Sequence, residues 1–231
     1  MALQFTISAT CPGNSARLGR VETPHGGFDT PAFMPVATAA AMKCLTVEQV
    51  QASGSQIILN NAYHLMLRPG SERIARLGGT HRFMRWDGPI LTDSGGYQAF
   101  SMSDINSVGE TGVTFRSFVD GSRIELTPER SIEVQNQIGA DIIMAFDDCP
   151  PSREEDCVNP EKRVRLAGTT HEQRLRDSND RTARWLERCI RAHARPQDQA
   201  LFGIVQGGTS EALRRRSVEQ VCAHDLPGYA I

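Results

Sequence analysis

The chain has 231 residues, of which 39% are hydrophobic and 23% charged, and its formal net charge is −2. These values are ordinary for a soluble globular protein, and the length suffices for one good-sized domain or a large piece of a bigger one. The apolar runs are far too short to cross a bilayer and no secretion signal is evident, so we expect a cytoplasmic protein with no membrane partner. The slightly negative charge excludes a broadly basic nucleic-acid-binding surface, so contact with RNA would need a local patch.

Elements of secondary structure can be predicted in chain order from local signals. Thr46 to Gln49 forms a capping box for a helix that Gly54 ends. Thr127 and Pro128 are typical of the start of a later helix, which Gly139 closes. Further helices are expected at residues 69–77 and 209–223, and strands at residues 57–60, 89–92, 142–146 and 201–205, with the start of another at 229–231.

A hairpin interrupts this alternation of strands and helices. Asp120-Gly121 is a strong turn signal between two segments of strand-forming residues, 113–118 and 123–126. We expect it to be part of an insertion at about 99–126 in a single domain that covers residues 1–231. The charged stretch 151–184 is expected to be a solvated loop and an exposed helix.

Alternating strands and helices predict an α/β fold with a parallel sheet. An open doubly wound sheet and a (β/α)8 barrel both fit this pattern. No G-x-G-x-x-G motif follows a strand, which weakens the nucleotide-binding open sheet. Polar residues cluster just past several predicted strands, where a barrel places its active site, so we favour the barrel. These clusters are Asn60-Asn61, Asp93-Ser94, Asp147-Asp148 and Gln206-Gly207.

The segment Asp93-Ser94-Gly95-Gly96-Tyr97-Gln98 has the residue types of a purine site. Its aspartate can accept hydrogen bonds from a ring N–H and an exocyclic amine. Its two glycines allow the backbone to approach a flat ligand closely, and its tyrosine offers a ring for stacking. A glycine-rich turn capped by an aspartate is the purely structural interpretation.

Two further strand ends carry complementary groups. Asp147 could grip a guanine-like edge or act with Asp93 as acid and base, or it could simply cap the following helix. Gln206 supplies an amide able to pair with a carbonyl oxygen, and Gly207 allows close approach. Three strand ends suited to one planar, amide-like ligand are harder to explain by structure alone than any one of them.

Five ordered motifs occur along the chain: Phe33-Met34-Pro35-Val36, Asn61-Ala62-Tyr63-His64-Leu65 with Leu67-Arg68-Pro69-Gly70, Leu91 to Gln98, Met144 to Cys149, and Gly203 to Gly207. From about Arg17 to Ile231, the sequence with these motifs resembles the tRNA-guanine transglycosylases, also called queuine tRNA-ribosyltransferases. It departs from the family pattern at Ala62, where threonine is usual, and in a charged stretch near 168–176 that is longer than in typical bacterial members.

The resemblance implies a (β/α)8 barrel enzyme, a pentosyltransferase of queuosine biosynthesis. It would exchange guanine at the wobble position of tRNAs with a GUN anticodon for a 7-deazaguanine. Asp93 would be the proton acceptor and, with Ser94, Gly95, Gly96 and Tyr97, would form the base pocket. Asp147 would contact the edge of the base that carries the ring N–H and the amine, and Gln206 and Gly207 would lie at its carbonyl. Cys149 would lie near the incoming base, and Asn61 near the nucleophile.

The family's nucleophilic aspartate and its zinc site, a C-x-C-x-x-C with a later histidine, match no residue here. Zinc is therefore expected in the full-length family protein, with no metal ligands in this chain. We expect a partial barrel of five strands and the start of a sixth, without the C-terminal strands and zinc subdomain, in a protein that is a dimer at full length. The six cysteines show no C-x-x-C spacing and are expected to be reduced thiols: Cys11, Cys44, Cys149, Cys157, Cys189 and Cys222.

Two other function classes remain open on the sequence. A base- or tRNA-binding fragment without turnover would have the recognition residues and no nucleophile. An unrelated barrel hydrolase would use Asp93 and Asp147 alone. For the incoming base, Cys149 favours the small aminomethyl base preQ1, whereas Arg191-Ala192-His193 and residues 225–229 are closer to members that take queuine.

Overall fold

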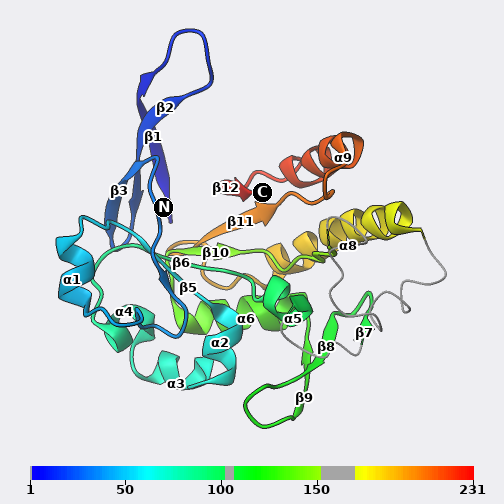
Figure 1. The fold of residues 1–231 in the computed structure, drawn as a ribbon, viewed down its shortest axis with the longest axis horizontal. Coiled ribbons are helices and arrows are strands. Elements are labelled where there is room, and N and C mark those ends of the chain that lie inside the picture. Colours follow the sequence, from blue (N-terminus) through cyan, green and yellow to red (C-terminus); the bar gives the residue numbers. More distant parts are fainter. Residues whose placement is uncertain (1, 102–106, 152–169) are drawn as a thin grey trace.

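The computed structural model describes residues 2–101, 107–151 and 170–231 (Figure 1). Its centre is a six-stranded sheet in which every neighbouring pair of strands is parallel. The order across the sheet, β4-β5-β6-β10-β11-β12, is also the order along the chain. These strands are Val36–Ala37 (β4), Ile58–Asn60 (β5), Ile90–Thr92 (β6), Ile142–Met144 (β10), Ala200–Ile204 (β11) and Gly228–Ala230 (β12).

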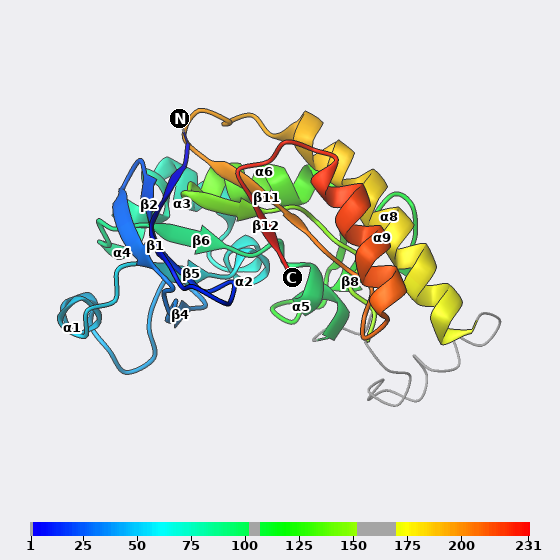
Figure 2. The same ribbon diagram turned by 90° about the horizontal axis from the view of Figure 1, so that it is seen from above.

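Helices connect successive strands of this sheet, which confirms the predicted α/β fold with a parallel sheet. Helices α8 and α9 pack side by side along one flank (Figures 1 and 2). The crossovers contain Val47–Ala52 (α1), Ala62–Leu67 (α2), Ser71–Arg76 (α3), Gly79–Met84 (α4), Gly96–Ser101 (α5), Pro128–Ile138 (α6), His171–Ala192 (α8) and Glu211–Cys222 (α9). No helix among the described residues is long and apolar enough to cross a membrane.

The predicted helix caps are confirmed. The Thr46 side chain accepts from the backbone of Gln49, and the Gln49 side chain accepts from the backbone of Thr46, which closes the capping box of α1. Helix α6 starts at Pro128 behind its N-cap Thr127 and ends at Gly139, which adopts the left-handed conformation at φ 81°. Local side-chain chemistry therefore fixes these helix ends.

The helix predicted at residues 69–77 is confirmed as α3, with slightly narrower bounds, and the segment between β5 and β6 also contains α2 and α4, which were not predicted. Gly70, at φ 102°, and Gly78, in the left-handed conformation, separate α3 from its neighbours α2 and α4. Helix α3 packs mainly against α6, with Ile74 fully buried. Glycines with positive φ break the segment into turns that wrap around the outside of the sheet.

The expected hairpin is present after α5. Val113–Arg116 (β8) pairs antiparallel with Arg123–Leu126 (β9), and Ser107–Val108 (β7) adds a short third strand. The inner side of β8 buries Val113 and Phe115 in the main apolar core. Residues 102–106 of the expected insertion lie outside the described residues.

The expectation of a merely exposed helix in the charged stretch is wrong. Helix α8 buries one face, including Trp185 and Leu186, in the same core as Phe146. Two arginines of α8 also pair with the buried carboxylate of Asp148 in the loop after β10, as described below. The rest of the stretch, residues 152–169 with Cys157, lies outside the described residues.

An N-terminal antiparallel sheet was not predicted. Gln4–Thr10 (β1), Arg17–Thr23 (β2) and Gly26–Thr30 (β3) form a three-stranded sheet that stands away from the parallel sheet (Figure 1). Most of its residues are exposed, including Phe5 and Ile7, so burial gives little signal in this part of the sequence.

The buried carboxylate of Asp141 joins this N-terminal sheet to the parallel sheet. It accepts hydrogen bonds from His25, in the β2–β3 turn, at 2.7 Å and from His81, in α4, at 3.0 Å. The backbone N–H groups of His25 and Ile90 donate to it as well. Burial would raise the pKa of Asp141, but the hydrogen bonds from His81, His25 and Ile90 outweigh burial and lower it.

We therefore predict that Asp141→Asn lowers the free energy of unfolding by about 2–3 kcal/mol at neutral pH, because donors on three segments lose a charged acceptor. Because the pKa is lowered on folding, the stabilising effect of Asp141 is present above the ordinary carboxyl pKa and is lost as the pH falls through the folded value. Chemical denaturation at several pH values checks both points. The exposed Asp87→Asn is the control, and an equal loss of stability in both variants would contradict the role of Asp141.

Candidate functional site

The carboxyl ends of four neighbouring strands meet at one edge of the parallel sheet, and each is followed by a polar side chain predicted to be functional. Asn61 follows β5, Asp93 follows β6, Asp147 lies three residues beyond β10, and Gln206 follows β11. Since these strands are adjacent in the sheet, their C-terminal residues lie together. Hydrogen bonds link these side chains in two groups.

Asp93 is the centre of the first group. Its Oδ2 accepts from Asn61 Nδ2 at 2.5 Å, and its Oδ1 accepts from the backbone N–H groups of Ala62 and Gly95 at 2.9 and 3.2 Å. Burial raises the pKa of Asp93 to about 7, although the two backbone donors oppose the shift. A carboxylate with this pKa exchanges a proton readily at neutral pH, as a general base should.

Asp147 is the centre of the second group. Its Oδ1 accepts from the Ser94 hydroxyl at 3.1 Å, and its Oδ2 accepts from Gln206 Nε2 at 2.5 Å. Burial raises the pKa of Asp147 to about 6; the hydrogen bond from Ser94 opposes the rise and the charge of Asp148 adds to it. At pH 7 the group is largely ionised and offers two acceptor oxygens to the pocket.

Glycines allow the loops between these groups to pack closely. A Cβ at Gly96 would lie 3.0 Å from Asp147 Oδ1 and 3.1 Å from the Asp147 carbonyl oxygen. Gly95, at φ 76°, lies against the side chain of Tyr63. Gly207, at φ 122°, would place a Cβ 2.6 Å from the backbone nitrogen of Arg214. The glycines thus bring backbone and carboxylates together, and Gly95 and Gly207 need their backbone conformations.

The remaining predicted residues sit at the rim. The Tyr97 side chain is 63% exposed and projects into solvent, so its ring is available for stacking. Cys149 is half-buried beside Asp147 and Gln206, and burial followed by the charge of Asp147 raises the pKa of its thiol to about 12. The thiol is therefore a neutral, compact wall of the site and not a nucleophile.

A family model described as queuine tRNA-ribosyltransferase matches residues 11–231. Proteins named queuine tRNA-ribosyltransferase from Bacillus thuringiensis (strain Al Hakam), Bacillus mycoides (strain KBAB4) and Bacillus cereus (strain B4264) are each 50% identical to the chain over 230 residues. The chain belongs to the queuine tRNA-ribosyltransferase family. Each match covers 100% of this chain and 56% of the relative, so the chain spans little more than half the length of these curated relatives.

The transglycosylase motifs are held in place by a layer of residues that sequence reasoning missed. The Ser131 hydroxyl of α6 donates to the Ser94 carbonyl at 2.8 Å. One turn later, the buried Gln135 bonds both the N–H and the carbonyl of Met144 in β10 at 2.9 Å. Polar residues on the buried face of an amphipathic helix were the available signal, because burial requires them to find partners.

Two arginines hold the side chain of Asp148, the residue next to Asp147. Its fully buried carboxylate accepts from Arg174 at 2.5 and 2.8 Å and from Arg181, both in α8. Its backbone N–H donates to the Thr182 hydroxyl at 3.1 Å. The sequence places these residues in a charged stretch 26 to 34 positions away, so spacing gives no indication of the contact. Among the described residues, these arginines pair with Asp148 and not with its neighbour Asp147.

One group of described residues could offer three ligands to a metal ion: His25, His81 and Asp141. The two imidazoles are stacked, with ring centroids 3.5 Å apart and planes 15° apart. A metal bound by an imidazole lies near the plane of the ring, and two stacked, nearly parallel rings cannot both point at one ion in that way. Each ring nitrogen instead meets a carboxylate oxygen, so we interpret the group as hydrogen-bonded.

We predict that Gly96→Ala lowers the affinity for guanine-like bases at least about tenfold, because the added methyl group displaces the Asp147 loop and strains it by about 1–3 kcal/mol. Isothermal titration with guanine checks the change. Gly109→Ala is the matched control, since a Cβ there meets nothing within 4 Å. Unchanged affinity in Gly96→Ala would show that the close approach of this loop to Asp147 is irrelevant to binding.

Proposed function

We propose that the site formed by Asp93, Asp147 and Gln206 holds the purine of a base-exchange reaction on tRNA, in which guanine at the wobble position of a GUN anticodon is replaced by a 7-deazaguanine. One observation carries the proposal. The buried Asp147 carboxylate accepts from Gln206 and from Ser94, the residue next to the half-buried Asp93, so two carboxylates and an amide follow three neighbouring strands at one edge of the sheet. Membership of the family, and the name that its relatives carry, support this reaction class.

The hydrogen-bonding groups of Asp147 and Gln206 complement a guanine edge. The Asp147 carboxylate accepts from both the ring N–H and the exocyclic amine, which form a bidentate donor pair. The Gln206 amide, which donates to Asp147 in the free site, turns to the carbonyl oxygen of the base. Tyr97 stacks on the exposed face of the base, and Ser94, Gly95 and Gly96 close the other side. Gly207 lets the Gln206 loop approach.

In the proposed reaction, a carboxylate nucleophile attacks C1′ of the ribose, and the bond from C1′ to guanine breaks with its electron pair leaving on the base. The resemblance to the family assigns this nucleophile to no residue of the chain and places Asn61 near it. The incoming base then loses its ring proton to Asp93, and its nitrogen displaces the enzyme carboxylate from C1′. The pKa of Asp93, raised to about 7, suits this proton acceptor.

We further propose preQ1 as the favoured incoming base and queuine as the alternative. The half-buried Cys149 beside Asp147 presents a compact thiol to the pocket. A small aminomethyl substituent fits against such a wall more readily than a bulky cyclopentene. Competition between preQ1 and queuine for the protein at its natural length distinguishes the two bases.

We also propose the architecture that the family resemblance implies. A (β/α)8 barrel is supported by six parallel strands whose spatial order follows the chain, each reached through helices. Its two edge strands carry exposed apolar side chains, Val36 in β4 and Tyr229 in β12, that pairing with further strands would cover. A zinc site, a dimer and a cytoplasmic place of action follow from the family resemblance and the tRNA substrate.

Binding without turnover is the competing proposal, because the base-recognition residues are in this chain and the nucleophile is assigned to none of its residues. Exchange of labelled guanine into tRNA, measured beside equilibrium binding of a 7-deazaguanine, separates the two. Binding with no exchange at any protein concentration would support the binding-only class and overturn the exchange reaction.

We predict that Asp147→Asn weakens guanine binding about 100-fold, because the loss of the bidentate acceptor costs about 2–3 kcal/mol. The fold should not weaken at neutral pH. Burial raises the pKa of Asp147 to about 6, so the charged form is disfavoured in the folded state and its destabilising effect grows as the pH rises from about 4 to 6. Titration calorimetry and thermal unfolding measure the two effects, with the exposed Asp120→Asn as control. A loss of stability with no loss of binding would reverse this assignment.

A further inference from the structure

A cluster of positive charge lies outside the proposed base site, in the region of α3 and α4. Residues 68–85 contain five arginines and a single carboxylate, Glu72, a formal charge of +4 in a chain whose net charge is −2. None of the five has a carboxylate oxygen within 4.0 Å among the residues that the structure describes. They are Arg68, Arg73, Arg76, Arg82 and Arg85, all exposed.

Several arginines elsewhere in the protein are paired with carboxylates. In α8 and α9, Arg184, Arg188, Arg215 and Arg216 each contact a carboxylate at 2.7 or 2.8 Å. Pairing of this kind cancels charge locally. The α3–α4 region instead keeps a cluster of like charges, whose mutual repulsion costs free energy unless an anionic partner is bound.

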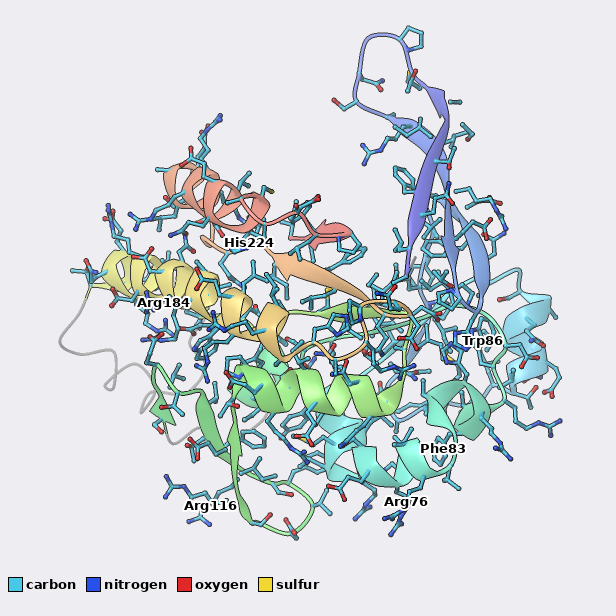
Figure 3. All side chains as sticks on the ribbon, turned by 180° about the vertical axis from the view of Figure 1, so that it is seen from behind. Arg76, Phe83, Trp86, Arg116, Arg184 and His224 are labelled. Atoms are coloured by element: carbon cyan, nitrogen blue, oxygen red, sulfur yellow. The ribbon has the colours of Figure 1, made fainter. Side chains whose placement is uncertain are left out.

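Two arginines of this cluster line a hollow. A surface depression of about 330 Å³ is lined by Arg73 and Arg76 of α3, Arg130 of α6, and Glu72. Arg76 projects from the outer surface of the helical layer (Figure 3). Arg130 is held at 2.6 Å by Glu133, whereas Arg73 and Arg76 have no such anchor among the described residues. Three guanidinium groups against one lining carboxylate give the hollow a positive field suited to an oxyanion.

The hollow shares its walls with the base site. Helix α2 begins at Ala62, whose N–H donates to Asp93, and it reaches the hollow at Met66. In α6, Ser131 donates to the Ser94 carbonyl on the inner side, and the preceding residue, Arg130, lines the hollow on the outer side. One pair of helices therefore contacts the base loop on one face and the basic hollow on the other.

We propose that this hollow binds phosphate groups of the RNA backbone that flank the exchanged nucleotide, with Arg73 and Arg76 as the contacting residues. The inference rests on the proposed tRNA substrate and adds a binding surface to it. RNA is favoured over an acidic protein because its phosphates are presented at regular intervals along the strand that must enter the neighbouring base site. Arginine forks match phosphate oxygens in pairs.

The test uses the protein at its natural length and a fluorescently labelled tRNA with a GUN anticodon. Anisotropy titrations between about 50 and 200 mM salt give the affinity and its salt dependence. The double variant Arg73→Ala/Arg76→Ala should weaken tRNA binding about tenfold or more and make the slope of log affinity against log salt shallower by about 1–2. Its affinity for free guanine and its melting temperature should not change.

The matched control is Arg191→Ala/Arg215→Ala, which removes two exposed arginines whose carboxylate partners are one helical turn away. Equal losses in both double variants would indicate a general effect of charge and overturn the proposal. The proposal would also be overturned if the tRNA affinity of Arg73→Ala/Arg76→Ala stayed unchanged while inorganic phosphate protected Arg73 and Arg76 of the natural protein from chemical modification. Competition by poly-glutamate as strong as that by RNA would overturn it too. If the protein did not bind guanine but its tRNA binding still depended on Arg73 and Arg76, the proposed base site would be refuted. The proposed role of the hollow would not be affected.

Discussion

The rest of the site depends on two carboxylates that are withdrawn from water, the half-buried Asp93 and the buried Asp147. Burial raises both pKa values, to about 7 and about 6, so the folded chain bears a cost for holding them ionised. Donors from Asn61, Ser94 and Gln206 reduce that cost, and they reach the carboxylates because parallel strands deliver their carboxyl ends to one edge. A carboxylate with a pKa near 7 can take up and release a proton at neutral pH, which the proposed base exchange requires.

The surroundings of the site follow from this constraint. Asp148 is also buried, yet Arg174 and Arg181 pair with its carboxylate, so the loop after β10 has one fixed aspartate and one available aspartate. A buried ion pair that loses one partner leaves an uncompensated charge and is strongly destabilised. The buried Asp148 therefore needs the arginines of α8 beside it. Arg73 and Arg76 of the basic hollow show the opposite state, since both are exposed and neither has a carboxylate oxygen within 4.0 Å among the described residues.

Much of the fold was predictable because its signals are local. Thr46 with Gln49, and Thr127 with Gly139, specify helix ends within a few residues, and short apolar runs locate the strands of the sheet. The strand-end position of Asp93 and of the other predicted site residues was predictable for the same reason. The contacts that hold them were not, because the partners are far apart in sequence: Ser94 and Asp147 are separated by 53 positions, and Asp147 and Gln206 by 59. The N-terminal sheet was missed because its strands bury too little for a clear pattern.

In the proposed complex, the Asp147 carboxylate accepts hydrogen bonds from two N–H donors of a guanine-like base. Carbon-13 NMR of labelled aspartate carboxyl groups, with and without saturating guanine, measures the effect of this contact. Hydrogen bonds to the ionised form favour that form, so the titration midpoint of Asp147 should fall from about 6 when the base is bound. In Gln206→Ala the shift should persist, because the two donors come from the base. An unchanged or raised midpoint for Asp147 in the presence of bound guanine would contradict the account.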